Sequence, residues 1–269
     1  MKFGFLMVLY NKKLEDSLTY KYLKKISNLL IIDNTIDPKI IYINNNFCTK
    51  NKIYYIAKKE NLGLSKAYNI GIDFFKNKNI DYLVLFDDDT DIGDKYIDTV
   101  LNYSYQKKTI YTPLIFDQNN KLVNPFYHND NYLIEYIKQR NYNSKEKLIP
   151  LIGSNKVFAI NSGMVIPFEI FDYLKYDENI FLDCVDYYFC RECYKLGYKI
   201  DVLPVEIKQS FSVMDIANKS FEQNIPRLAI RLKDTKAYDK KTYFLNKSIF
   251  VSMYFLRTKD FRYFKYLLK

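Results

Sequence analysis

The chain has 269 residues, of which 48% are hydrophobic and 27% charged, with only 7 Gly and 7 Pro, so its composition excludes fibrous and disordered chains. Four cysteines are too few for a disulfide scaffold in a chain of this length. Of the formal net charge of +10, residues 216–269 supply +9, with 13 Lys/Arg and 4 Asp/Glu, which leaves a nearly neutral body. A general nucleic-acid binder would spread its charge over the fold, so we expect no nucleic-acid partner and a single adhesive terminal segment.

Short apolar runs alternate with helical patterns in the first half of the chain. We expect strands at residues 3–10, 29–32, 40–44, 53–57 and 82–86, and helices at residues 14–27 and 65–75. This alternation predicts an α/β fold with a Rossmann-like, mainly parallel sheet flanked by helices. The first run lacks a cleavage site for a leader peptide, and no run is long and uncharged enough to span a membrane.

The second half is less periodic. Residues 117–154 are polar and rich in Asn, and we expect loops there with one helix near residues 132–139. After them we expect a strand at 157–166 broken at 161–163, a short helix at 168–174, a helix at 183–196 and a last strand at 199–203. Asp183 is the expected N-cap of the 183–196 helix, and Gly197 ends it. The predicted organisation is a body of residues 1–215, divided near residue 110, followed by a basic helical extension, 216–269.

Three consecutive carboxylates, Asp87, Asp88 and Asp89, follow the strand expected at 82–86. Two unit charges roughly 6 Å apart repel by about 3 kcal/mol at an effective dielectric of about 20, so a cation or water must neutralise such a cluster. In extended geometry Asp87 and Asp89 share a face and Asp88 points away. Such oxygen ligands suit Mg²⁺ or Mn²⁺ bridging to phosphate, and a solvated turn is the alternative.

A polar turn that contains Asn61 and Gly63 opens the helix expected at 65–75. Free backbone N–H groups at a helix start, together with Lys66, would suit a phosphate. The same residues are equally explained by a local role, with Ser65 as the N-cap, Gly63 as a turn residue and Lys66 as a solvated charge.

Asp183 and Asp186 are expected on the first turn of one helix. The helix dipole would keep both carboxylates ionised, and capping alone explains their spacing. An ionised Asp at the ligand edge of a sheet could also accept a proton from a sugar hydroxyl.

Six segments, in this order, resemble the family-2 glycosyltransferases of the GT-A fold, especially the rhamnosyltransferase-like branch that builds bacterial surface polysaccharides. The likeness extends over roughly residues 3–210. The matching segments are Tyr10-Asn11, Ile32-Asp33-Asn34, the stretch from Asn61 through Asn69 to Ile72, Asp87-Asp88-Asp89-Thr90, Ser162-Gly163 and the stretch from Phe181 to Cys190.

The resemblance implies an inverting transferase that moves a sugar from a dTDP- or UDP-sugar to a carbohydrate acceptor, which in such pathways is usually lipid-linked. It implies that Asp33 binds the base, that Asp87 and Asp89 hold Mn²⁺ or Mg²⁺ on the diphosphate, and that Asp186 is the general base with Asp183 beside it. The implied donor-binding residues are Tyr10, Asn11, Asp33, Asn34, Asn61, Gly63, Lys66, Asn69, Asp87, Asp88, Ser162 and Gly163.

The chain departs from the family pattern in two places. Many relatives carry a His after the last strand that reaches the metal or diphosphate, where this chain has Gln209, and its single His, His128, lies in the irregular middle region. The usual Arg six residues after the base is replaced by Glu192, with Arg191 one place earlier.

Aromatic and aliphatic residues recur at helical spacing between the basic residues of 216–269. Such an amphipathic segment suits an anionic membrane surface, which predicts a cytoplasmic protein held at the inner face of the cell membrane. The alternative is that its apolar face packs on the body or on a second subunit in a homodimer.

Other functions are compatible with parts of this pattern. A sugar-nucleotide nucleotidyltransferase shares the sheet type and the acidic site, but it opens with a Gly-rich loop, and residues 10–14 contain no Gly. A non-catalytic membrane- or nucleic-acid-binding module would use the basic extension alone, and Gln209 leaves room for an inactive transferase.

Overall fold

A computed structural model of the chain describes residues 1–129, 144–209 and 216–268. The strands are β1 (Phe3–Leu9), β2 (Leu29–Asp33), β3 (Tyr54–Ala57), β4 (Tyr82–Asp87), β5 (Thr90–Asp91), β6 (Thr109–Phe116), β7 (Leu122–Asn124), β8 (Phe126–Tyr127), β9 (Val157–Phe158), β10 (Met164–Pro167) and β11 (Lys199–Gln209). The α-helices are α1 (Tyr20–Leu23), α2 (Pro38–Lys50), α3 (Gly63–Phe75), α4 (Lys95–Asn102), α6 (Lys145–Leu148), α7 (Val185–Lys195), α8 (Phe221–Tyr238), α9 (Tyr243–Thr258) and α10 (Lys265–Leu268). Short 3-10 helices are η1 (Leu14–Asp16), η2 (Ile149–Leu151), η3 (Phe168–Asp172) and η5 (Phe261–Phe264).

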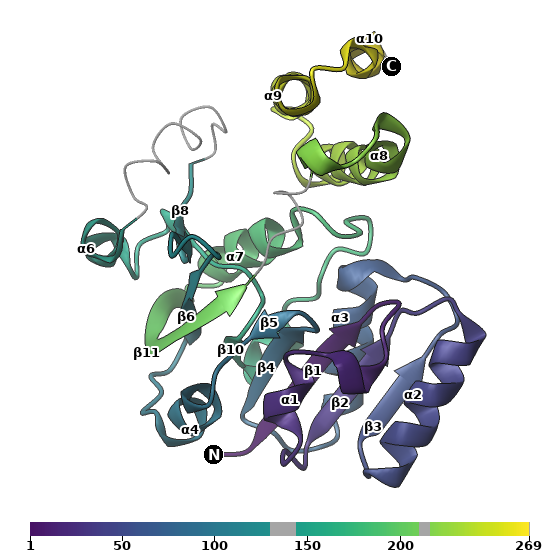
Figure 1. The fold of residues 1–269 in the computed structure, drawn as a ribbon. Coiled ribbons are helices and arrows are strands. Elements are labelled where there is room, and N and C mark those ends of the chain that lie inside the picture. The colour runs from purple at the N-terminus through teal and green to yellow at the C-terminus, as the bar shows by residue number, and fades with distance from the viewer. Residues whose placement is uncertain (130–143, 210–215, 269) are drawn as a thin grey trace.

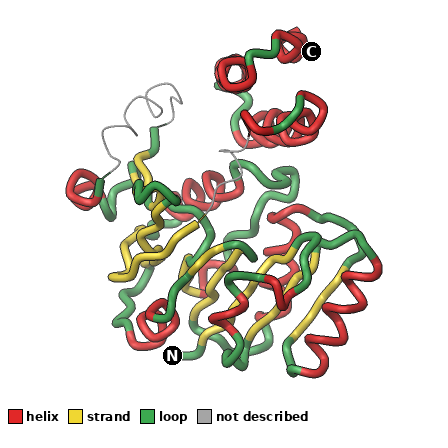
Figure 2. The backbone as a smooth tube through the Cα atoms, in the orientation of Figure 1, coloured by secondary structure: helices red, strands yellow, loops and turns green. Residues whose placement is uncertain are grey.

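One large sheet organises the body, and helices flank it (Figures 1 and 2). Its strand order is β3-β2-β1-β4-β10-β6-β11-β5, and β7 pairs with β6 outside this path. The strands from β3 to β4 are all parallel, whereas β10 runs antiparallel to both β4 and β6. The predicted α/β class is confirmed, and the antiparallel β10 makes the whole sheet mixed.

Alternation along the central strands separates two hydrophobic cores. Leu6 and Val8 of β1 belong to the core that includes residues of α3 and α7, whereas Phe5, Met7 and Leu9 belong to the core that includes residues of α1 and α4. Every residue of β1 is buried, as expected for a strand covered by helices on both faces. Because the strands are parallel, Leu9 pairs with Asp33 and Val8 with Asp87, so three strands end at one edge.

Several predicted elements differ from the structure. The predicted strand at 40–44 lies inside α2, where Asp37 caps the helix by accepting from the Lys39 N–H and Pro38 occupies the first turn. The predicted helix at 14–27 is reduced to η1 and α1, since Ser17 and Thr19 are bonded to the backbone of the 87–90 segment instead. The last strand, β11, continues to Gln209, and the helix predicted at 132–139 lies outside the described residues.

The strand predicted at 157–166 is two strands, β9 and β10, separated by the predicted break. The short helix predicted at 168–174 is the 3-10 helix η3. The helix predicted at 183–196 begins only at Val185, and Cys184, in a left-handed conformation with φ 63°, occupies its N-cap position.

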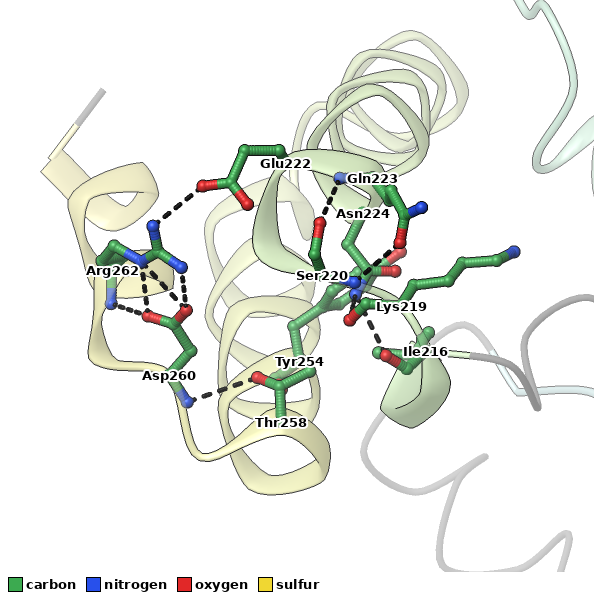
Figure 3. A network of polar contacts seen from close by, with 10 residues as sticks. All are labelled: Ile216, Lys219, Ser220, Glu222, Gln223, Asn224, Tyr254, Thr258, Asp260 and Arg262. Carbon is green, nitrogen blue, oxygen red and sulfur yellow. Dashed lines mark hydrogen bonds and ion pairs between the residues drawn. The ribbon is translucent and has the colours of Figure 1, made fainter.

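The C-terminal helices α8, α9 and α10 lie together at one end of the molecule, beyond α7 (Figure 1). They share a small hydrophobic core that includes Phe221, Leu228, Phe250 and Tyr254. Polar contacts tie their ends together (Figure 3): Ser220 forms a capping box with Gln223, and Arg262 joins Asp260 to Glu222. No helix in the described part of the chain combines the length and apolarity that crossing a membrane requires.

Candidate active site

The acidic cluster lies where β4 ends. Asp87 is the last residue of β4, and Asp88 and Asp89 form a turn before β5. The alternation expected for Asp87 and Asp89 therefore does not extend past Asp87, because the backbone is no longer extended there. The three carboxylates follow β4 at the edge of the sheet where β1 and β2 also end.

Asp87 is held from two other parts of the chain. Its Oδ2 accepts hydrogen bonds from the Ser162 hydroxyl and, at 3.3 Å, from Gln209 Nε2. Burial raises the pKa of Asp87, and the neighbouring Asp88 adds to this, while the bonds from Ser162 and Gln209 act in the opposite direction. Gln209, at the position where the family resemblance led us to expect His, thus contacts the acidic cluster through its amide.

Asp88 does not point away from the site but binds the segment that follows β1. Its Oδ1 is 2.7 Å from Lys12 Nζ, and its Oδ2 accepts from the Tyr10 N–H at 3.2 Å. Its carbonyl oxygen accepts from the Ser17 hydroxyl. These contacts hold Tyr10, whose side chain is 46% exposed, at the same edge of the sheet.

Asp89 is the exposed member of the cluster. Its pKa is raised to about 6 by desolvation and by the charges of Asp87 and Asp88, while Lys12 and a backbone hydrogen bond act in the opposite direction. Among the described residues, no group of three His, Cys, Asp or Glu side chains is arranged to hold a metal ion unaided. The uncompensated negative charge nevertheless fits a hard divalent cation that takes further oxygen ligands from a phosphate.

Asp186 is the second residue of α7, and its Oδ1 accepts from the Asn161 N–H at 3.2 Å. Burial raises its pKa to about 7, and the charges of Asp87 and Asp183 contribute, against the hydrogen bond from Asn161. The expectation that the helix dipole keeps this carboxylate fully ionised is therefore wrong. A carboxyl group with a pKa near 7 is suited to proton transfer at neutral pH.

Asp183 does not cap α7. Arg227 of α8 donates to both of its oxygens, the Nη2–Oδ1 distance being 2.7 Å, and Arg231 Nη2 lies 3.4 Å from Oδ1. Although burial acts in the opposite direction, these two guanidinium groups hold the pKa of Asp183 below its usual range. Asp183 is thus a structural partner of α8, within electrostatic range of Asp186.

Three side chains that were predicted to bind the nucleotide-sugar form hydrogen bonds within the protein instead. Asp33 is completely buried, and its carboxylate accepts from Tyr55, Asn44 and the Thr35 N–H. Asn34 Nδ2 donates to the Gly63 carbonyl. The Asn69 amide binds both backbone groups of Tyr176 and also Glu178. In this conformation Asp33 and Asn69 hold neighbouring segments and present no free surface to a base or a sugar.

The glycine-containing turn is fixed from within. Asn61 Oδ1 accepts from the Gly63 N–H, and the Leu64 N–H donates to the Phe181 carbonyl at 2.7 Å. Gly63 has φ +77°, and a Cβ there would lie 2.4 Å from that carbonyl oxygen. Part of the helix start is therefore used to dock the segment before α7, while Lys66 remains exposed.

The remaining predicted residues lie at the edge of the sheet. Asn11 has φ 48°, and its N–H donates to the Thr35 hydroxyl. Ser162 binds Asp87, and Gly163, also left-handed, accepts from the Tyr96 hydroxyl. Hydrogen bonds thus link Tyr10 to Asp88 and Ser162 to Asp87, and the charge of Asp87 acts on Asp186.

Sequence reasoning missed several residues around the site. Tyr68 and Asn161 lie near Asp87 and Asp186, which raise the pKa of the buried Tyr68 phenol after desolvation. The Tyr68 hydroxyl and Asn161 Nδ2 are buried, and neither has a hydrogen bond of good geometry to a described residue. Asn161 could have been suspected from its place beside Ser162, but nothing in the local sequence marks Tyr68.

His128 and the cysteines have no place in this site. His128 lies outside the regular elements, directly after β8, and its ring is buried with its centroid 3.7 Å from that of Phe158. All four cysteines are free, and Cys190 and Cys193 are buried on α7.

Comparison with known proteins supports the resemblance. Residues 12–174, more than half of the chain, match the sequence profile of glycosyl transferase family 2. The chain is 28% identical over 181 residues to the dTDP-rhamnosyl transferase RfbF of Shigella flexneri, a match that covers 65% of this chain and 57% of that protein.

Solved structures share the fold. GalNAc-T7, crystallised with UDP, GalNAc and Mn²⁺, superposes with a TM-score of 0.55 at 13% identity over 78% of this chain and 44% of its own. TarS residues 1–349 from S. aureus, in complex with UDP, superposes with a TM-score of 0.51 at 14% identity over 89% of this chain and 67% of its own. The chain thus spans about half the length of several proteins that it resembles.

Proposed function

The chain belongs to glycosyl transferase family 2, and from this we propose that it transfers a sugar from a nucleotide-sugar donor to a carbohydrate acceptor in the synthesis of a surface polysaccharide. The observation that carries the proposal is the juxtaposition of Asp87 and Asp89, at the end of β4, with Asp186, at the start of α7. The similarity to a dTDP-rhamnosyl transferase favours a dTDP-sugar as donor, with a UDP-sugar as the alternative.

Asp87 and Asp89 would hold Mn²⁺ or Mg²⁺ on the donor diphosphate. Their raised pKa values support this, because such carboxylates gain most from a neighbouring positive charge. When bound, the ion would stabilise the charge of the departing nucleoside diphosphate. Gln209 and Ser162 keep the Asp87 carboxylate in place through hydrogen bonds to its Oδ2.

Asp186 would accept the proton of the acceptor hydroxyl during a single, inverting displacement at the anomeric carbon. The Asn161 N–H binds its Oδ1 and so orients the carboxyl group, while burial brings its pKa to about 7. A positioned base of this kind contributes about 10²- to 10⁴-fold in rate.

The donor would lie along the edge formed by Tyr10, Asn11, Ser162 and Gly163, with Lys66 exposed nearby. Lys12 belongs to this group, because its bond to Asp88 places a positive charge beside the acidic cluster. Asp33, Asn34 and Asn69 would support this edge without contacting the donor. Their side chains bind the backbone of Thr35, Gly63 and Tyr176, respectively.

Nucleotide binding tests the proposal. We expect dTDP or UDP to bind much more tightly with Mn²⁺ than without it, and Asp89→Ala to remove the metal-dependent part. The matched control is Asp172→Ala, an exposed carboxylate on η3. Metal-independent binding that Asp89→Ala leaves unchanged would refute the metal site. Formation of a nucleotide-sugar from a nucleoside triphosphate and a sugar phosphate would instead identify a nucleotidyltransferase.

The C-terminal helices would hold the enzyme at an anionic membrane surface, on the cytoplasmic side, where a lipid-linked acceptor is available. Large apolar side chains are exposed there: Phe244 is 74%, Phe261 74% and Leu268 93% exposed. Exposed lysines accompany them at Lys240, Lys241 and Lys259. Attraction of basic residues to anionic lipids contributes about 1 kcal/mol each.

Vesicle binding separates this role from dimer formation. Reversing the charge of Lys240, Lys241 and Lys259 to Glu should weaken binding to phosphatidylserine-containing vesicles at least 100-fold, since three favourable contributions of about 1 kcal/mol become unfavourable. The same change at the body residues Lys24, Lys50 and Lys107 should have little effect. Equal binding by both triple variants, with a dimer in sedimentation, would favour a subunit contact.

A further inference from the structure

We infer that α8 supports the active site. Its residues Asp234 and Arg227 are positioning residues that hold the loop immediately before the catalytic carboxylate of Asp186. The inference rests on the proposed role of Asp186. The loop consists of residues 181–184, immediately before α7, and will be called the base loop. The basic extension would then have two functions: α8 would support catalysis, and α9 and α10 would provide the proposed membrane contact.

Asp234 binds the backbone of the base loop with both of its oxygens. Oδ1 accepts from the Phe181 N–H at 2.9 Å, and Oδ2 accepts from the N–H groups of Leu182 and Asp183 at 2.7 and 2.8 Å. The Asp234 side chain is completely buried. Three consecutive N–H groups directed at one carboxylate form a cradle for an anion, which this chain fills with its own side chain.

Arg227 and Arg231 hold the side chain of the same loop. Arg227 donates to both oxygens of Asp183, and Arg231 reaches Oδ1 at 3.4 Å. Because residues 227, 231 and 234 are four and three positions apart on α8, they lie on one face of the helix. That single face therefore contacts both the backbone and the carboxylate of the base loop.

The geometry of the base loop requires outside support. Cys184 has φ 63°, an unusual conformation for a non-glycine residue, and no side chain caps α7. From the opposite side, the Phe181 carbonyl accepts from the Leu64 N–H of α3 at 2.7 Å. The loop is thus held between α3 and α8, and Asp186 follows two residues after its last member. A shift of α8 would displace the carboxylate relative to Asn161 and Asp87.

A displacement of the base loop should lower turnover without changing nucleotide binding. A general loss of stability should lower both. The nucleotide edge is built from β1, β4 and the Ser162 segment, with no described hydrogen bond from α8. Losing Asp234 should therefore lower kcat while leaving the Kd for the nucleotide in place. A misplacement of about 1 Å in a catalytic group can cost about 100-fold in rate.

The experiment compares Asp234→Asn and Arg227→Lys with two control variants of α8. Lys233→Gln changes an exposed residue beside Asp234, and Asp239→Asn, at the C-cap of α8, weakens the hydrogen bonds that the carboxylate accepts from Lys241 and Thr242 without touching the base loop. For Asp234→Asn we expect kcat to fall at least 10-fold, the Kd for dTDP or UDP with Mn²⁺ to change less than twofold, and amide hydrogen exchange at residues 181–183 to accelerate. Arg227→Lys, which keeps the charge but loses the two-pronged contact, should give a smaller loss of the same kind.

Each result decides between the alternatives. If kcat stays within twofold of wild type in both variants, if kcat and nucleotide affinity fall together, or if Lys233→Gln and Asp239→Asn lower kcat as much as Asp234→Asn does, the positioning role is refuted. If Asp234→Asn does not fold, Arg227→Lys alone decides. A wild-type protein that binds nucleotide but turns over no donor would refute the proposed function, while unaltered exchange at residues 181–183 in Asp234→Asn would refute this inference by itself.

Discussion

Replacing Asp186 with asparagine is expected to abolish transfer and, at neutral pH, to raise the free energy of unfolding. The carboxyl group has an ordinary pKa of 3.8, and the fold raises it to about 7 through burial and the nearby charge of Asp87. A group with a raised folded pKa favours the fold while it is protonated and opposes it once it is ionised. The penalty is absent below about pH 4, grows between pH 4 and 7, and is complete above pH 7.

The shift sets the size of this effect. About three pKa units at 1.36 kcal/mol each amount to about 4 kcal/mol at pH 8, an upper limit because the site can relax. Asparagine has nearly the same shape and can still accept from the Asn161 N–H through its Oδ1, so Asp186→Asn should recover a large part of this energy. Stability that is recovered when a functional group is removed is characteristic of residues retained for catalysis.

Urea unfolding of wild type and Asp186→Asn from pH 4.5 to pH 8 measures the difference directly. We expect similar stability near pH 4.5 and a growing advantage for Asp186→Asn as the pH rises. Asp172→Asn, at an exposed position on η3, should show no such trend. An Asp186→Asn variant that is no more stable than wild type at pH 8 would show that the carboxylate carries no electrostatic penalty. Turnover that survives this substitution would separately exclude it as the base.

Three further predictions concern residues around the same edge. Gly63→Ala should destabilise the protein by about 1–3 kcal/mol or more in thermal unfolding, because its Cβ would lie 2.4 Å from the Phe181 carbonyl and the backbone is left-handed; an unchanged Tm would contradict this. Tyr68→Phe removes a fully buried hydroxyl that has no well-formed hydrogen bond to a described residue, so the free energy of unfolding should change by less than about 0.5 kcal/mol in urea; a larger loss would show that the hydroxyl is bonded to Asp87 or Asn161. Gln209→His should tighten Mn²⁺ binding severalfold in titration calorimetry, since an imidazole nitrogen would replace an amide that lies 3.3 Å from Asp87; weaker binding would show that Gln209 serves only to hold Asp87.

The local sequence predicted much of the nucleotide half of the fold. The apolar runs that became β1, β2 and β4 and the glycine turn before α3 were found from periodicity and turn chemistry alone. The run at 40–44 was assigned wrongly because its apolar residues suit a strand or a helix, although Asp37 and Pro38 are a helix start. A single helix was predicted at residues 14–27 because the local sequence does not show that Ser17 and Thr19 bind the backbone at the end of β4.

The sequence identified the acidic residues of the site, but their roles depend on residues that are distant in the sequence. Asp33 and Asp183 were both expected to act locally or on a ligand, but Tyr55 and Asn44 enclose the first and Arg227 and Arg231 bind the second. No local pattern predicts those partners, because they come from other elements that packing brings together.

The sequence by itself determined where strands end, and so placed a run of aspartates at the ligand edge of a parallel sheet. Only the tertiary structure decided which of those carboxylates is exposed, that Asp186 has a pKa near 7, and that α8 holds the loop before it. The reason is physical: a side chain's preference for strand or helix depends on its neighbours along the chain, whereas its charge state and its partners depend on burial and on groups that only the folded chain brings within a few ångströms.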